Sequence, residues 1–184
     1  PQVVETLAAL MQEHGKAVSI GEGSAAVYGY NVNRDGDTCF MDDPAQLDAM
    51  QQSVFDRLGY TRLADSLGVP LVNLHTGEMV DVEVPGGGLA YQRLTLHRSL
   101  TEIDLLCSVP MMKTHERALV SLGMKNLIGL YPGCVYGTVR SSVHDQATRA
   151  GSPGIAYETI DMVRANKLGL VVIDGSRAME GNGP

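Results

Sequence analysis

The sequence predicts an α/β fold in which a mostly parallel sheet is flanked by helices in Rossmann-like layers. Two observations carry this prediction. Helical and strand-like patterns alternate along much of the 184-residue chain. The runs 103–109 and 168–173 are almost unbroken apolar stretches, which are typical of strands buried on both faces of a parallel sheet. With 44% apolar and 19% charged residues, we expect one α/β domain over 1–184 with a core of its own.

The first part of the chain alternates helical and strand patterns. Apolar residues at helical spacing run up to Gly15, and a second such stretch starts at Asp43-Pro44, an N-cap followed by proline, and stops at Gly59. Between them, a short apolar run leads into a glycine-rich turn. The predicted elements are helices over 1–15, 43–59 and 60–67 and strands over 16–20 and 69–74.

The rest of the chain predicts a hairpin and two further strands. A glycine-rich turn after Pro85 separates two alternating segments, which indicates an inserted β-hairpin near 79–97. A helix over 155–166 lies between the apolar strands 103–109 and 168–173. If the strands are parallel, the loops that follow them share one edge, where open sheets bind ligands. These loops are 21–24, 74–77, 110–115 and 174–184.

Composition excludes several classes of function. The net charge of −7 disfavours a nucleic-acid partner, but the segment 110–150 carries +3, a local field that suits a small anionic ligand. No apolar run reaches the roughly 18 residues that span a bilayer, and no signal segment is recognisable. We therefore expect no membrane partner and, by default, a cytoplasmic location.

Cofactor motifs are weak. Cys39, Cys107 and Cys134 are too far apart to form an iron–sulfur cluster motif. The pattern Gly21-x-Gly23 is a variant of the glycine motif that binds dinucleotides, but no amphipathic helix pattern follows it. We therefore expect no bound nucleotide, and the sequence does not identify any other cofactor.

The candidate catalytic residues are Lys113, His115 and Asp174, each directly after a predicted strand. Lysine can hold a carboxylate or phosphate, and histidine can transfer a proton. Lys125 and Asn126 lie among glycines that let backbone N–H groups approach an anion, and His144 is a further polar candidate. His115 and His144 are the candidate metal ligands, although no metal-binding spacing joins them. Each of these residues could equally be an ordinary loop side chain.

Several of these elements occur together in a known family. The runs Ser108–His115, Ser121–Leu130, Val172–Gly175 and Met179–Pro184, together with His144, resemble the family called domain of unknown function 362. They contain Lys-Thr-His, Lys-Asn-x-x-Gly and Glu-Gly-x-Gly-Pro in that order. The resemblance covers nearly the whole chain. It adds Glu180 and Gly183 to Lys125, Asn126 and His144 as expected substrate-binding residues. It also implies that the chain is the central part of a longer family domain.

The family has no established general activity, so the resemblance limits rather than defines the function. Members often carry iron–sulfur modules, which implies redox chemistry and an external iron–sulfur protein as a partner. The leading hypothesis is an enzyme, an oxidoreductase or isomerase, acting on a small anionic substrate at the carboxyl edge of the sheet. The alternative is a non-catalytic module that binds an anion or docks a redox partner. An open sheet edge would also favour a homo-oligomer.

Overall fold

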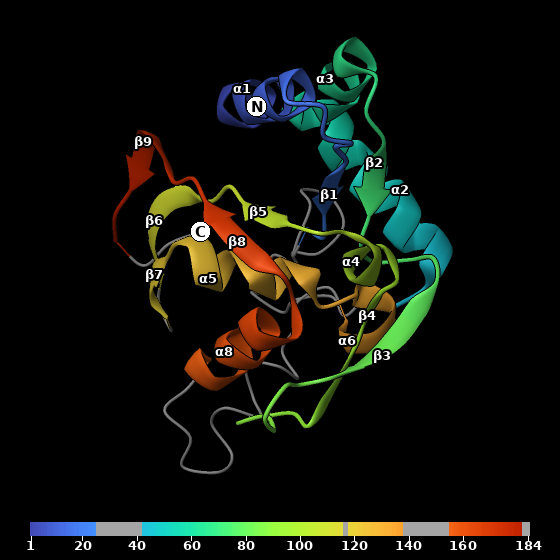
Figure 1. Cartoon of the computed structure of the whole chain (residues 1–184), viewed down its shortest axis with the longest axis vertical. Helices are drawn as coiled ribbons and strands as arrows, with labels where there is room; N and C mark the ends of the chain where they lie inside the picture. Colours follow the sequence, from blue (N-terminus) through green and yellow to red (C-terminus); the bar gives the residue numbers. More distant parts are fainter. Residues whose placement is uncertain (25–41, 116–117, 138–154, 182–184) are drawn as a thin grey trace, which may run out of the picture.

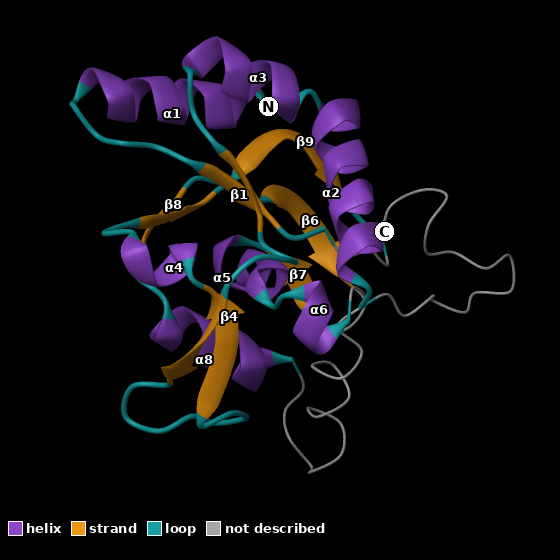
Figure 2. Cartoon of the chain, turned by 90° about the vertical axis from the view of Figure 1, so that its right-hand side faces the viewer, coloured by secondary structure: helices purple, strands orange, loops and turns teal. Residues whose placement is uncertain are grey.

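The computed structural model describes residues 1–24, 42–115, 118–137 and 155–181. It is a mixed α/β arrangement of helices around short strands (Figure 1). Figure 2 shows α1 and α3 at one end of the molecule and α8 with β4 at the other.

The first unit is a parallel strand pair with its connecting helices. β1 (Ile20–Glu22) pairs with β2 (Leu71–Asn73), and α2 (Pro44–Leu58) and α3 (Tyr60–Leu67) come between them in the chain. The Asp43 carboxylate caps α2 by accepting the Gln46 N–H at 2.9 Å. Gly59, in the left-handed conformation with φ of 79°, ends this helix. α1 (Gln2–Glu13) packs against α3. The three predicted helices and the strand over 69–74 are confirmed with bounds shifted by a few residues, whereas the strand predicted over 16–20 shares only Ile20 with β1, which continues into the predicted loop 21–24.

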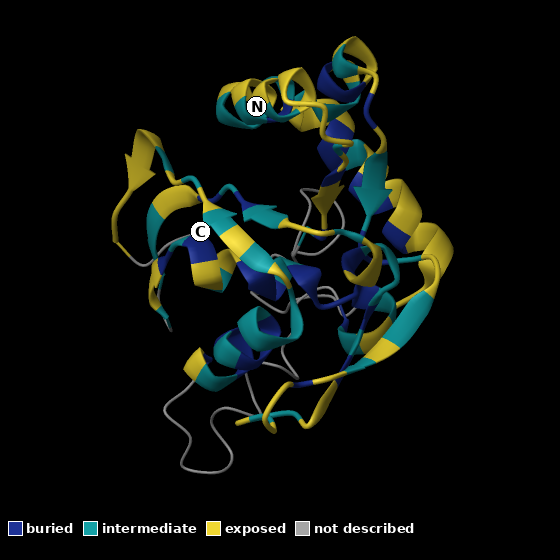
Figure 3. Ribbon diagram, viewed as in Figure 1, coloured by how far each residue is buried: buried dark blue, intermediate teal, exposed yellow. Residues whose placement is uncertain are grey.

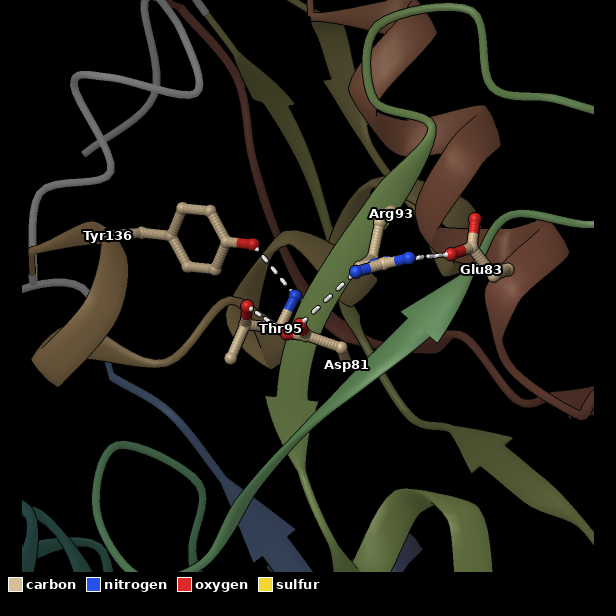
Figure 4. Close-up of polar contacts among 5 residues, drawn as sticks. All are labelled: Asp81, Glu83, Arg93, Thr95 and Tyr136. Carbon is tan, nitrogen blue, oxygen red and sulfur yellow. Dashed lines mark hydrogen bonds and ion pairs between the residues drawn. The ribbon is translucent and has the colours of Figure 1, made fainter.

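The predicted hairpin is also confirmed. β3 (Met79–Glu83) and β4 (Arg93–His97) are antiparallel, and the short helix α4 (Ser99–Glu102) follows. Figure 4 shows the pairs on its exposed face: Thr95 Oγ1 donates to Asp81 at 2.7 Å and Arg93 Nε donates to Glu83 at 2.7 Å. The Thr95 N–H donates to the hydroxyl of Tyr136 at 3.0 Å, which joins the hairpin to a helix that comes much later in the sequence.

The second unit contains two parallel strand pairs that follow each other along the chain. β5 (Leu106–Ser108) pairs with β8 (Leu168–Val171), and β6 (Met111–His115) pairs with β9 (Asp174–Met179). Two backbone bonds bridge the pairs: the Val172 N–H to the Ser108 carbonyl at 3.0 Å and the Asp174 N–H to the Pro110 carbonyl at 2.8 Å. β7 (Leu119–Ser121) adds an antiparallel partner to β6.

Short helices fill the space beside these strands. They are α5 (Gly123–Asn126), the 3₁₀ helix η1 (Leu127–Leu130), α6 (Gly133–Tyr136) and, later in the chain, α8 (Ala156–Ala165). α8 packs against η1 and α5. The main core lies between them and the hairpin, with Leu94, Leu127, Tyr131 and Met162 almost completely buried. Gly123 is required where α5 meets β8, because a Cβ there would lie 2.3 Å from Val171 Cγ1.

The expectation of one mostly parallel, Rossmann-like sheet is not met in the described part of the chain. Its hydrogen-bonded strands form small sheets of both kinds: β1-β2 and β5-β8 are parallel, β3-β4 is antiparallel and β7-β6-β9 is mixed. Segments 111–115 and 174–179, predicted as loops, continue as strands. Nor is the strand within 103–109 buried on both faces, since Leu106 and Cys107 of β5 are only half-buried. Figure 3 shows β9 as largely exposed.

Candidate functional site

The strand β6 carries the two basic candidates on one face. Side chains alternate across a strand, so Lys113 and His115 point to the same side of β6 and Thr114 to the other. Thr114 confirms this geometry, because its hydroxyl donates to the Gly181 carbonyl at 2.7 Å, beyond the end of β9. The expected lysine–histidine pair is therefore a strand pair, held between β7 and β9, and not a loop pair.

Lys113 is a half-buried cation in a neutral setting. It lies opposite Ser121 of β7 and Met179 of β9, and burial lowers the pKa of its ammonium group. Within the residues that the structure describes, no carboxylate forms an ion pair with it. A partly desolvated ammonium without a counter-charge is a ready binding partner for an anion.

His115 ends β6 with one ring nitrogen engaged. Its Nδ1 accepts the backbone N–H of Ala118 at 3.1 Å. In the neutral ring, Nε2 therefore carries the proton. The ring can donate a proton through Nε2, which is the chemistry that an acid–base histidine needs.

Asp174 begins β9, opposite Met111 at the other end of β6 from His115. Its Oδ1 accepts the N–H and the hydroxyl of Ser176 at 3.0 and 2.6 Å. These bonds lower the pKa of the Asp174 carboxyl group, and the N-terminal ammonium group adds to the effect. The carboxylate thus caps a turn, and the role expected of it, orienting a cation, a hydroxyl or His115 itself, stays a prediction.

The helix α5 carries the next two candidates. The Asn126 amide donates to Ser108 Oγ at 3.2 Å, and that hydroxyl donates to the Gly123 carbonyl at 3.0 Å. Ser108 is buried at the end of β5, so this chain of bonds ties α5 to that strand. Lys125, beside Asn126, is half-buried. The structure places both directly after β7, the antiparallel partner of the strand that carries Lys113 and His115.

The remaining predicted residues are not gathered at this site by any described contact. Glu180 is exposed directly after β9. His144 and Gly183 lie outside the described residues, so the proposed histidine pair for a metal is untested. Within the described ranges, no cluster of three or more His, Cys, Asp or Glu side chains is arranged to hold a metal ion.

A second polar cluster, which the sequence did not single out, lies at the carboxyl edge of β1 and β2. His75 is completely buried: its Nδ1 accepts the Gly133 N–H at 2.9 Å and its Nε2 faces the Ser24 carbonyl at 2.9 Å. Gln51, also fully buried, accepts the Ser24 N–H at 2.9 Å. We call Ser24, Gln51, His75 and Gly133 the His75 cluster. The position of His75 after a predicted strand was the signal that could have found it.

The hydrogen bonds fix the state of His75. Because Nδ1 accepts a backbone N–H, Nε2 must carry the proton and donate it to the Ser24 carbonyl. If the ring were doubly protonated, its Nδ1–H and the Gly133 N–H would be two donors that face each other without an acceptor. The ring is therefore a neutral structural crosslink between segments that are far apart in the sequence, and both of its nitrogens are occupied.

The end of β1 and the start of β9 both lie near Tyr60, at the start of α3. Burial raises the pKa of its hydroxyl group, and the negative charges of Glu22, at the end of β1, and Asp174, at the start of β9, add to this. A nearby apolar groove of about 330 Å³ lies between α1 and Val172. None of the candidate polar side chains lines that groove.

Taken together, these features define a mixed α/β protein with a basic strand, β6, beside a short glycine-flanked helix. The family model for the domain of unknown function DUF362 matches residues 1–184, and the chain belongs to that family. It is also similar to the thylakoid-associated protein sll1697 of Synechocystis sp. (strain ATCC 27184 / PCC 6803 / Kazusa), with 26% identity over 184 residues. That alignment covers all of this chain and 47% of the relative, so the chain spans about half the relative's length. No solved structure matches the chain.

The family assignment confirms the resemblance drawn from the Lys-Thr-His, Lys-Asn-x-x-Gly and Glu-Gly-x-Gly-Pro motifs. In the described residues, no helix is both long and apolar enough to cross a bilayer. The relative's name associates that protein with thylakoids, so a cytoplasmic location for this chain is not confirmed.

Proposed function

We propose that the chain binds a small anionic substrate at β6, with Lys113 as its main counter-charge. The observation that carries this proposal is the half-buried Lys113 ammonium, which has no carboxylate partner among the described residues and whose pKa burial lowers. An anion placed there would restore the electrostatic stabilisation that burial removed. Lys125 and Asn126 on α5 are the proposed further contacts.

The proposed chemistry is proton transfer by His115 on the bound anion. His115 shares a face of β6 with Lys113, and its Nε2 carries the proton in the neutral ring. A general acid two residues from the anion's counter-charge can act on the same ligand. The family resemblance favours a redox or isomerase reaction, and an external iron–sulfur protein or a second copy at an open sheet edge as further partners.

The alternative is a binding module without catalysis, and one observation favours it. Asp174, the expected orienting carboxylate, is engaged by Ser176. His115→Gln separates the two functions. In a binding module this variant changes anion affinity alone. In an enzyme it abolishes turnover of a substrate that still binds.

The binding proposal is tested by isothermal titration with inorganic phosphate and with malonate. Lys113→Met keeps the length of the side chain and removes its charge, and we expect it to weaken binding at least about tenfold, the worth of one charge-assisted contact. Affinity of the unmodified chain should fall as the pH rises through the lowered pKa of Lys113, because the neutral amine no longer attracts an anion.

The matched control is Lys16→Met, which removes an exposed charge after α1 and should leave binding unchanged. Circular dichroism confirms that each variant is folded. If folded Lys113→Met binds both anions as tightly as the unmodified chain, the proposed site is wrong.

A further inference from the structure

Two carboxyl groups lie one turn apart on α8, and their surroundings are opposite. Asp161 and Glu158 are both completely buried. The Asp161 carboxylate accepts three backbone N–H groups, from Leu89 and Ala90 at 2.8 and 2.7 Å and from Tyr91 at 2.9 Å. Neither carboxyl oxygen of Glu158 has a hydrogen-bond partner among the described residues.

This difference in hydrogen bonding decides which of the two carboxyl groups keeps a proton. Three N–H donors stabilise the charged form of Asp161, whereas at Glu158 the cost of burying the charged form outweighs the opposing effect of its own backbone N–H. The negative charge of Asp161, one turn away on the same helix, disfavours a second charge on Glu158. When two neighbouring carboxyl groups differ in this way, the unsolvated one keeps the proton.

Among the described residues, the groups that face Glu158 offer no compensating positive charge. Tyr91, before β4, and Tyr131, after η1, are its aromatic neighbours, and the Tyr131 hydroxyl donates to the backbone carbonyl of Glu158 at 3.1 Å. Tyr136 of α6 packs edge-on against Tyr131, with ring centroids 4.9 Å apart. Arg164 of α8 is bonded to the Pro85 and Gly87 carbonyls, and the described contacts do not bring Lys125 of α5 to the Glu158 carboxyl.

We propose that Glu158 is a proton-binding residue that holds α8 against η1 only while its carboxyl group is neutral. Ionisation would place a bare charge among the buried tyrosines, and the chain can relieve this only by letting α8 move and water enter. α8 also contacts α5, which carries Lys125 and Asn126, so the same movement reaches that segment. The proposal goes beyond anion binding and does not depend on it.

The sign of the pH effect follows from burial. Burial raises the pKa of Glu158 above its ordinary value. Its contribution to stability is therefore fully present in acid and is lost as the pH rises through the raised pKa.

The test compares the free energy of unfolding of the unmodified chain with that of Glu158→Gln, whose amide mimics the neutral carboxyl. We expect equal stability in acid, and an advantage of Glu158→Gln that grows as the pH rises. The control Glu102→Gln changes an exposed carboxyl at the end of α4 and should show no such growth. If Glu158→Gln is the less stable protein at neutral pH, Glu158 is ionised and the proposal is wrong.

A second measurement keeps the proposal testable if Glu158→Gln does not fold. In the unmodified chain with ¹³C-labelled glutamate carboxyl groups, assigned through the backbone by NMR, the Glu158 signal should titrate at the highest pH of all glutamates. Titration together with exposed glutamates such as Glu102 would overturn the proposal. Neither measurement involves an anion, so their outcome is separate from that of the Lys113 experiment.

Discussion

Two regions of this protein use histidine at the end of a strand in opposite ways. In the His75 cluster, both ring nitrogens are hydrogen-bonded and the side chain is fully buried. At β6, His115 is half-buried with one nitrogen engaged by a described donor, and the neighbouring Lys113 has no described counter-ion. The comparison teaches that a polar residue after a strand can be fully occupied as a structural crosslink, as His75 is, so its position alone does not mark a ligand site.

The largest expected effect comes from making the same substitution in both regions. His75→Ala removes two buried hydrogen bonds and leaves a cavity, so we expect a loss of about 3–5 kcal/mol in the free energy of unfolding. His115→Ala removes the bond that the ring accepts from the Ala118 N–H, at a half-buried position, and the loss should stay below about 1.5 kcal/mol. Urea unfolding followed by circular dichroism measures both. Equal losses would break the comparison.

A smaller effect is expected at the backbone that meets His75. A Cβ at Gly133 would lie 2.6 Å from His75 Nδ1 and 2.9 Å from Leu47 Cδ2, so Gly133→Ala should cost about 1–3 kcal/mol. The control is Gly175→Ala in β9, where the nearest atom is the flexible end of Met112 at 3.7 Å, and the change should stay within about 0.5 kcal/mol. If Gly133→Ala unfolds at the same urea concentration as the unmodified chain, the His75 cluster is less rigid than its bonds indicate.

The smallest expected change in stability comes from removing the charge of Asp174. Its lowered pKa means that the charged carboxylate stabilises the fold above the ordinary aspartate pKa, and that this contribution is lost as the pH falls through the lowered value. Asp174→Asn should therefore lower the melting temperature slightly at neutral pH, and the difference should close in acid. Asp104→Asn, at another exposed aspartate, is the control. A difference that persists unchanged in acid would show that the charge is not what matters at Asp174.

The local structure was largely predictable, because its signals are local. The Asp43 cap and the left-handed Gly59 define α2 within the sequence, and the glycines after Pro85 define the hairpin. The polar run Lys113-Thr114-His115 follows a proline, which predicts a loop, yet it forms a strand because β7 and β9 supply partners on both sides. β7 follows closely in the chain and β9 comes from a distant segment, but neither partner leaves a mark in the run itself.

The candidate site was predictable only in part, for the same reason. Lys113 and His115 on one strand, and Lys125 and Asn126 on the following helix, come from motifs that the sequence displays. His75 was missed because its partner Gly133 is 58 residues away. Glu158 lies on a helix whose spacing is evident, but nothing in that spacing shows that both carboxyl oxygens are buried without a donor. The spacing of residues in the sequence identifies which face of a helix they share, whereas the solvation of a side chain depends on the whole fold.

The bond between Gly133 and His75 has a consequence for how the molecule opens. α6 is only four residues long, and a helix of that length frays quickly when it stands alone. The Gly133 amide, however, is bonded to a fully buried side chain whose other ring nitrogen is bonded to the Ser24 carbonyl. Its deuterium exchange therefore requires the edge of β2 to separate from α6, so these two elements form a single cooperative unit of native-state opening.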